Sequence, residues 1–237
     1  MKKIPEKKSN KKLYTFLLYV LTLYIIFATD SLFFSTNIQK NIVKLSQYII
    51  IILTFIMFFY YFIQREQKVD LFFLSLLCAI LLIGMLATED YTGGYFYKIF
   101  LLLFSFLFFQ CFSTDDFFKA YLFWMGIIAI VSLAAFVVGN LVTAIPFLPK
   151  ITNVLGRNYI SFLFTNVPET VALRNRNYGP FWEPGVYQGY LIVALMLCLF
   201  YKKKQNPWEI LLYCVAILTT YSTTGIMALA AVMAGYI

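Results

Sequence analysis

The sequence predicts an all-α, multi-span helical integral membrane protein with about seven spans and an incomplete eighth. Three observations favour this fold class. The 237 residues are 62% hydrophobic and only 13% charged, whereas a soluble domain has roughly 25% charged residues. Apolar runs of about the length that a bilayer requires follow one another along the chain. Charged residues, glycines and prolines gather at the ends of these runs rather than inside them.

A basic tail, residues 1–12, precedes the first apolar run. A secretory signal would have a shorter apolar core and a small-residue cleavage site, so we predict an uncleaved first span. This span opens a block of five transmembrane helices within residues 13–145. The five predicted helices are residues 13–29, 47–64, 71–88, 95–113 and 121–145.

A long connection, residues 146–184, separates this block from the remaining spans. Its length exceeds that of an ordinary connection, which argues for a function. Its aromatic residues predict a loop lying in the interfacial zone of the bilayer. The sixth span is predicted at residues 186–201, ending at three lysines.

The last stretch, residues 208–237, is almost uncharged. As one straight helix it would be about 45 Å long, which overshoots the bilayer. We therefore predict that residues 185–237 form transmembrane helices with a break at the Ser/Thr/Gly-rich residues 219–225. The chain is expected to be the N-terminal part of a longer protein, and this part alone is expected to be inactive.

Orientation follows from the placement of lysine and arginine. A cytoplasmic amino terminus puts twelve of the 19 basic residues inside and seven outside. This arrangement places residues 146–184 on the outer face. The predicted location is the bacterial cytoplasmic membrane.

Histidine is absent, and the four cysteines all lie inside apolar runs. The commonest general base and the commonest metal ligand are therefore missing. The cysteines show neither a pairing pattern nor metal-ligand spacing. We expect no metal, no cofactor and no nucleic-acid partner.

The densest polar chemistry lies in residues 173–185, next to the predicted sixth span. Arg157, Arg174 and Arg176 are candidate substrate ligands, because guanidinium groups bind phosphate bidentately and remain charged when partly desolvated. Contacts to lipid headgroups, or to backbone carbonyl groups, are the alternative for each of them. Glu183 is a candidate base or hydroxyl-orienting acceptor, and its alternative is an ion pair with Arg176.

Four further residues are candidate substrate ligands with structural alternatives. Tyr178 and Trp182 would serve either as sugar-stacking platforms or as interfacial anchors. Ser222 and Thr223 would either contact the substrate or bond to carbonyl groups of their own helix at a kink.

These residues carry a resemblance to a known family. The sequence RNYGPFWEPG, residues 176–185, resembles the R-x-x-G-x-F-x-E-P-G/N signature of the O-antigen ligase and polymerase family. The apolar run ending in TYSTTG, residues 220–225, is similar to the next element of that family, a span with a Ser-rich turn. The FWEPG form favours the polymerase branch. The two motifs cover only about residues 174–237.

The resemblance implies a metal-independent membrane glycosyltransferase of surface polysaccharide assembly. Such an enzyme would transfer a glycan from undecaprenyl diphosphate to an acceptor sugar hydroxyl on the outer face. Arg176 would bind and stabilise the diphosphate, and it joins Glu183 as a predicted catalytic residue. The implied partners are the lipid-linked oligosaccharide, the bilayer and other polysaccharide-assembly proteins. A second outer loop, which bears a histidine in ligases, is missing from these residues, so a base supplied by that loop would lie beyond residue 237.

Two other functions remain open. An O-antigen ligase would share both motifs. A lipid-linked oligosaccharide flippase or other transporter would also place arginines on the outer face, although transporters usually carry charged groups deep within their spans or internal repeats.

Overall fold

The computed structural model describes residues 11–28, 31, 48–59, 71–89, 93–152 and 156–236. It divides into two compact units, of which unit 1 comprises Met1–Lys40 and Phe117–Ile237 and unit 2 comprises Asn41–Asp116. The chain is mostly helical, as the sequence predicts. Most of the predicted basic tail and the predicted end of the second span, residues 60–64, lie outside the described residues.

Unit 2 contains three apolar helices. They are Tyr48–Phe59, α3 (Leu71–Thr88) and α4 (Gly93–Cys111). Helix α3 has the predicted bounds, and it packs against α4. Phe104 and Phe108 of α4 are fully buried.

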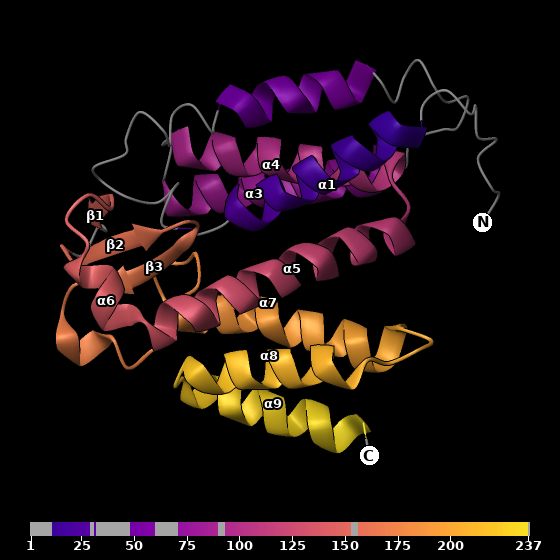
Figure 1. The fold of residues 1–237 in the computed structure, drawn as a ribbon. Helices are drawn as coiled ribbons and strands as arrows, with labels where there is room; N and C mark the ends of the chain where they lie inside the picture. Colours follow the sequence, from indigo (N-terminus) through magenta and orange to yellow (C-terminus); the bar gives the residue numbers. More distant parts are fainter. Residues whose placement is uncertain are drawn as a thin grey trace. The chain divides into compact units, whose positions relative to one another are not determined.

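Unit 1 contains five long helices among its described residues (Figure 1), and they share one apolar core. They are α1 (Lys11–Ala28), α5 (Thr114–Val137), α7 (Pro184–Met196), α8 (Pro207–Thr219) and α9 (Thr223–Tyr236). A π-helical turn, η3 (Leu197–Tyr201), continues α7. The Tyr213 hydroxyl donates to the Leu122 carbonyl at 3.1 Å and ties α8 to α5. The Tyr121 hydroxyl donates to the Tyr190 carbonyl at 2.9 Å and ties α5 to α7.

The predicted fifth span, residues 121–145, is divided in the structure. Helix α5 begins earlier, where the Ser113 hydroxyl accepts the Asp116 amide at 3.1 Å, a typical N-cap contact. It ends at Val137, and the short helix α6 (Gly139–Ala144) follows. Gly139 and Asn140 are poor helix formers, which explains a break that hydropathy alone does not reveal.

A three-stranded antiparallel sheet follows α6, and the sequence prediction missed it. Its strands are β1 (Lys150–Thr152), β2 (Asn158–Phe162) and β3 (Thr165–Pro168), in the order β1-β2-β3. Ile160 and Val167 pair across β2 and β3 and pack against Ala135 of α5. Tyr159 packs on the opposite face with Tyr178, as the alternation of side chains along a strand requires. The predicted interfacial loop is therefore a small folded layer.

Helices α8 and α9 form a hairpin rather than one interrupted span. Helix α8 ends at Thr219 and α9 begins at Thr223, inside the predicted break. The Tyr236 hydroxyl at the end of α9 lies 2.5 Å from Gln205 Oε1, just before α8 begins. The chain therefore returns to the end of unit 1 from which α8 starts, and Figure 1 shows the two helices side by side. We call residues 220–222 the hairpin turn.

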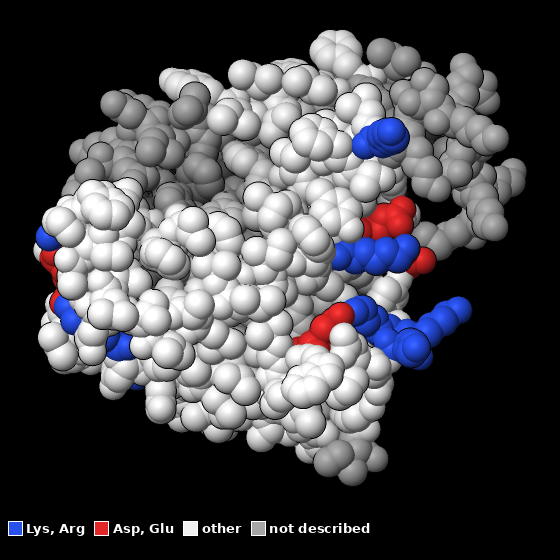
Figure 2. Space-filling model, in the orientation of Figure 1, with Lys and Arg blue, Asp and Glu red and all other residues white. Residues whose placement is uncertain are grey.

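Among the described residues, two helices are suited by length and composition to cross a membrane, namely Thr114–Val137 and Pro184–Tyr201. Large apolar side chains are exposed on the helices of unit 1, including Phe16, Ile130, Phe200 and Met227. Figure 2 shows the charged side chains of the visible face near two opposite edges, with a broad uncharged belt between them. Such a surface is typical of contact with lipid.

Candidate functional site

The candidate site is built on residues 174–183, which we call the motif loop. Asn177 anchors this loop at its centre. Its backbone N–H donates to the Thr219 carbonyl at 2.8 Å. Its Nδ2 donates to Thr219 Oγ1 at 3.1 Å and to Ser132 Oγ at 3.2 Å. Its Oδ1 accepts the Gly179 N–H at 3.1 Å. One side chain thus joins the loop to α5 and to the end of α8.

Gly179 makes the turn that follows. Its φ is +53°, and a Cβ at this position would lie 2.8 Å from the ring of Tyr187. A side chain is therefore excluded both by the backbone conformation and by the close approach of α7. Its carbonyl accepts the Asn166 N–H at 2.8 Å, which links the loop to β3.

The rest of the loop leads into α7. The buried ring of Phe181 stacks on Tyr190, with centroids 4.7 Å apart. Pro184 occupies the first turn of α7, where its missing N–H costs no helical hydrogen bond. Four residues of the RNYGPFWEPG sequence (Asn177, Gly179, Phe181 and Pro184) therefore have a structural role. Of the remaining polar side chains, those of Arg176 and Glu183 are exposed.

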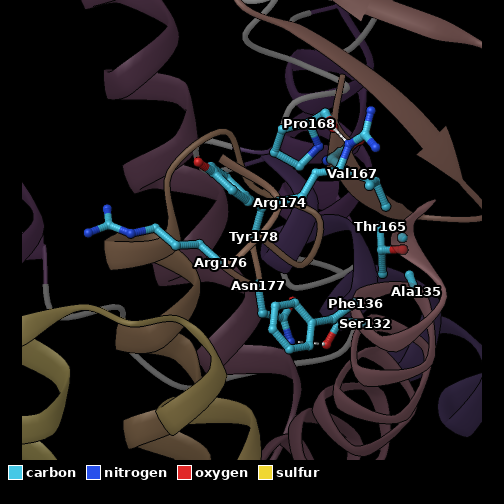
Figure 3. Close-up of a pocket in the computed structure, with 12 residues that line it drawn as sticks. Ser132, Ala135, Phe136, Thr165, Val167, Pro168, Arg174, Arg176, Asn177 and Tyr178 are labelled. Atoms are coloured by element: carbon cyan, nitrogen blue, oxygen red, sulfur yellow. Dashed lines mark hydrogen bonds between the residues drawn. The ribbon is translucent and has the colours of Figure 1, made fainter. Parts of the chain in front are cut away.

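Arg174 and Arg176 lie two residues apart but point in opposite directions (Figure 3). The guanidinium of Arg174 donates to the Pro168 carbonyl at 3.0 Å, the Glu169 carbonyl at 2.6 Å and Asn140 Oδ1 at 3.0 Å. It holds the end of β3 against α6. This geometry matches the alternative that Arg174 caps backbone carbonyl groups.

Arg176 is exposed, and no described residue forms a hydrogen bond or ion pair with its guanidinium. Its side chain extends away from the small pocket of Figure 3, to whose lining it contributes. Its five donors are therefore free for an anion.

Glu183 is exposed at the N-cap position of α7, and its side chain does not cap the helix. Within the described part of the chain its carboxylate has no ion-pair partner within 4.0 Å, so the alternative of an ion pair with Arg176 is not formed. A Cβ on Gly185 would lie 3.7 Å from Glu183 Oε1. The carboxylate therefore lies beside the first turn of α7, whose dipole favours a negative charge there.

The charges of the candidate site residues affect the pKa values of two neighbouring tyrosines, Tyr159 and Tyr178. Their rings meet edge to face, with centroids 5.5 Å apart. Burial raises the pKa of Tyr159 to about 12, opposed by the charge of Arg157 and reinforced by Glu183. Burial also raises the pKa of Tyr178, against the charges of Arg176 and Arg157. Arg157, Arg176 and Glu183 thus all act on Tyr178, whose hydroxyl stays protonated at neutral pH.

Trp182 is half-buried against the cluster formed by Ile151, Tyr159 and Tyr178. Its carbonyl accepts the Tyr159 hydroxyl at 3.2 Å. Trp182 therefore fastens the motif loop to the sheet.

The hairpin turn lies beside the motif loop, because Thr219 bonds to Asn177. Ser222 Oγ lies 3.0 Å from Thr224 Oγ1, and the Ser222 carbonyl accepts the Gly225 N–H at 2.9 Å. Thr223 is exposed at the first position of α9. Ser222 and Thr224 thus pair their hydroxyl groups at the start of α9, whereas the structural alternative predicted bonds to carbonyl groups of the same helix.

Sequence reasoning assigned no role to several residues that hold the site together. Ser132 bonds to both Asn177 and the Tyr187 hydroxyl, the latter at 2.7 Å. Gln188 packs directly against Gly225, where a Cβ would lie 2.3 Å from its amide carbon. Two features of the sequence could have indicated these contacts. Ser132 is a lone serine in an apolar run, and Gly225 follows a polar turn.

No group of three His, Cys, Asp or Glu side chains suited to a metal ion occurs among the described residues. Searches against protein-family models, curated proteins and solved structures find no match to this chain. What can be said of its function therefore rests on the residues of the motif loop and on their geometry.

Proposed function

We propose that the protein is a polysaccharide repeat-unit polymerase of the O-antigen ligase and polymerase type. The proposal rests on one observation, namely that the charged side chains of Arg176 and Glu183 are both left without a described partner. Both are exposed on the motif loop, neither has a described partner, and both act on Tyr178. A loop that buries its central residues and leaves a cation and a carboxylate free is typical of a binding site.

The protein would lie in the bacterial cytoplasmic membrane with the motif loop on the outer face. Helix α5 has 24 residues and α7 with η3 has 18, about 36 and 27 Å. The first exceeds a hydrocarbon core of about 30 Å, and the second lies near the short end of the usual range for a span. Helices α8 and α9 have 13 and 14 residues, about 20 Å each. They would form a re-entrant hairpin that enters from the cytoplasmic side and presents its turn to the motif loop. The hairpin takes the place of one of the seven predicted spans.

The reaction would be glycosyl transfer from undecaprenyl diphosphate. The acceptor hydroxyl oxygen attacks the anomeric carbon, and the bond from this carbon to the phosphate oxygen breaks. The diphosphate leaves with the bonding electron pair, and the hydroxyl proton passes to Glu183. Arg176 stabilises the negative charge that develops on the leaving diphosphate. Arg157, which is exposed, contributes further donors.

A test of this function compares product formation with transport. The full-length protein is purified into liposomes with the native undecaprenyl diphosphate-linked repeat unit, and chain length is followed by gel electrophoresis. Longer chains that appear without any other protein support the polymerase. Translocation of the lipid without a longer chain would favour the transporter instead. Transfer to a lipid A acceptor in place of a repeat unit would favour the ligase.

A further inference from the structure

The hairpin turn contains an aromatic residue, Tyr221, in an unusual backbone conformation. Tyr221 has a φ of +48°, in the left-handed region that residues with a Cβ rarely adopt. Its side chain is 58% exposed, so apolar packing does not require a tyrosine there. Asn or Gly would meet the needs of the turn at lower cost. A strained backbone that presents an exposed aromatic ring points to a binding role.

The position of the turn shows where this ring is presented. Tyr221 follows Thr219 by two residues, and Thr219 bonds twice to Asn177. Arg176 immediately precedes Asn177. From the spacing of Cα atoms, Arg176 and Tyr221 are no more than about 16 Å apart along this path. A diphosphate and one or two sugar rings span a comparable distance.

We propose that Tyr221 is a glycan-binding residue that stacks on a sugar ring of the lipid-linked oligosaccharide. This inference rests on the proposed function and adds a residue to that site. The face of a tyrosine ring is electron-rich, and it attracts the positively polarised C–H groups on one face of a pyranose. A phosphate would gain nothing from such a face. Tyr221 would therefore recognise the glycan, whereas Arg176 would recognise the diphosphate.

The test uses Tyr221→Gly and Tyr221→Phe in the full-length protein. Glycine adopts a positive φ without strain, so a purely structural residue would tolerate Tyr221→Gly with an equal or higher thermal midpoint. Two probes separate the two parts of the ligand: undecaprenyl diphosphate without sugar, and the native lipid-linked repeat unit. Affinity is measured for both, together with the thermal midpoint.

A matched control is Leu163→Gly. Leu163 also has a positive φ, +55°, and is 67% exposed, but it lies at the turn between β2 and β3. This substitution relieves the same kind of strain away from the hairpin turn. It should leave the affinity for both probes unchanged.

We expect Tyr221→Gly to weaken binding of the repeat-unit lipid about five- to tenfold. Its affinity for bare undecaprenyl diphosphate should stay within about twofold of wild type, with no loss of thermal midpoint. Tyr221→Phe keeps the ring and should retain both affinities. An unchanged preference for the repeat-unit lipid in Tyr221→Gly overturns the inference. Equal losses for both probes overturn it as well, because they indicate general damage or a lipid anchor. Failure of the wild-type protein to bind either probe refutes the proposed function itself.

Discussion

Asn177 and Thr219 form two hydrogen bonds between segments 42 residues apart. The Asn177 N–H and Nδ2 reach the carbonyl and the hydroxyl of Thr219 at 2.8 and 3.1 Å. Asn177 is only 3% exposed, so water does not compete for these bonds. The pair sets the position of the motif loop against the hairpin turn, and through it the position of Arg176.

Asn177→Ala should therefore destabilise the protein. It removes three side-chain hydrogen bonds, each worth about 0.6 kcal/mol on average between membrane helices and up to about 1.7. We expect a loss of about 1–3 kcal/mol in the free energy of unfolding, measured in detergent by steric trapping. Asn175→Ala is the control, because Asn175 is exposed and has no described hydrogen bond. Equal stability of the two variants would show that Asn177 does not anchor the loop.

The long helices of this protein could be predicted from hydropathy, because each lies in an apolar run between polar residues, whereas the short α6 could not. Helix α3 matches its predicted bounds. The sheet could not be predicted in this way, since strands of three to five residues give too short a pattern within a polar loop. The hairpin escaped prediction for another reason. Composition indicates a break at residues 219–225 but not the direction in which the chain continues.

The candidate site was predictable as a segment but not residue by residue. The density of polar side chains identifies residues 173–185. It does not reveal that Arg174 binds Asn140 and two carbonyl groups while Arg176 stays free. That difference depends on β3 and α6, neither of which the sequence pattern indicates.

Arg174 and Arg176 should respond in opposite ways to the same substitution. Arg174→Lys should cost about 1–2 kcal/mol of stability, because lysine cannot reach three acceptors in the fork geometry of a guanidinium. Arg176→Lys should leave stability unchanged and strongly shorten the polysaccharide, because lysine cannot clasp a phosphate bidentately. Unfolding of each purified variant and chain length in complemented cells are compared. Normal chains with Arg176→Lys at normal membrane abundance would remove Arg176 from the site.

Substitutions at Gly225 and Gln188 should compensate for one another in their effect on stability. A Cβ on Gly225 would lie 2.3 Å from Cδ of Gln188, so Gly225→Ala requires the buried side chain of Gln188 to move. We expect a loss of about 1–3 kcal/mol, the usual cost of overpacking. Gln188→Ala removes the obstructing atoms, so the double variant should recover much of the loss. Gly189→Ala, at a position with no atom within 4 Å of the added Cβ, is the control. Simple additivity of the two substitutions would contradict the close packing.

If α8 and α9 form a re-entrant hairpin, both of its ends lie on the cytoplasmic side of the membrane. Single cysteines at Gln205 and Gly235, in a variant without the native four, should both resist an impermeant thiol reagent in intact cells. Both should react after the membrane is permeabilised. A cysteine at the exposed Asn175 should react in intact cells. Labelling of Gly235 but not Gln205 from outside would show that α9 crosses the membrane.

Glu183→Gln separates a catalytic carboxylate from a structural one. The carboxylate has no described ion pair to lose, and the favourable effect of a charge near a helix N-terminus is about 0.3–1 kcal/mol. The stability of Glu183→Gln should therefore remain within about 1 kcal/mol of wild type. If Glu183 accepts the proton of the acceptor hydroxyl, chain extension by the full-length protein should slow by about 100- to 10,000-fold. Affinity for undecaprenyl diphosphate should be little changed, because Arg176 is intact.

Glu183→Asp extends the same test. It keeps the charge but withdraws the carboxylate by one methylene, so its rate should lie between those of wild type and Glu183→Gln. A rate within a few-fold of wild type for both variants would show that Glu183 is not the proton acceptor. A loss of carrier affinity equal to the loss of rate would instead place Glu183 in the binding of the diphosphate. Only slow transfer with intact binding is expected from a carboxylate that acts on the acceptor hydroxyl.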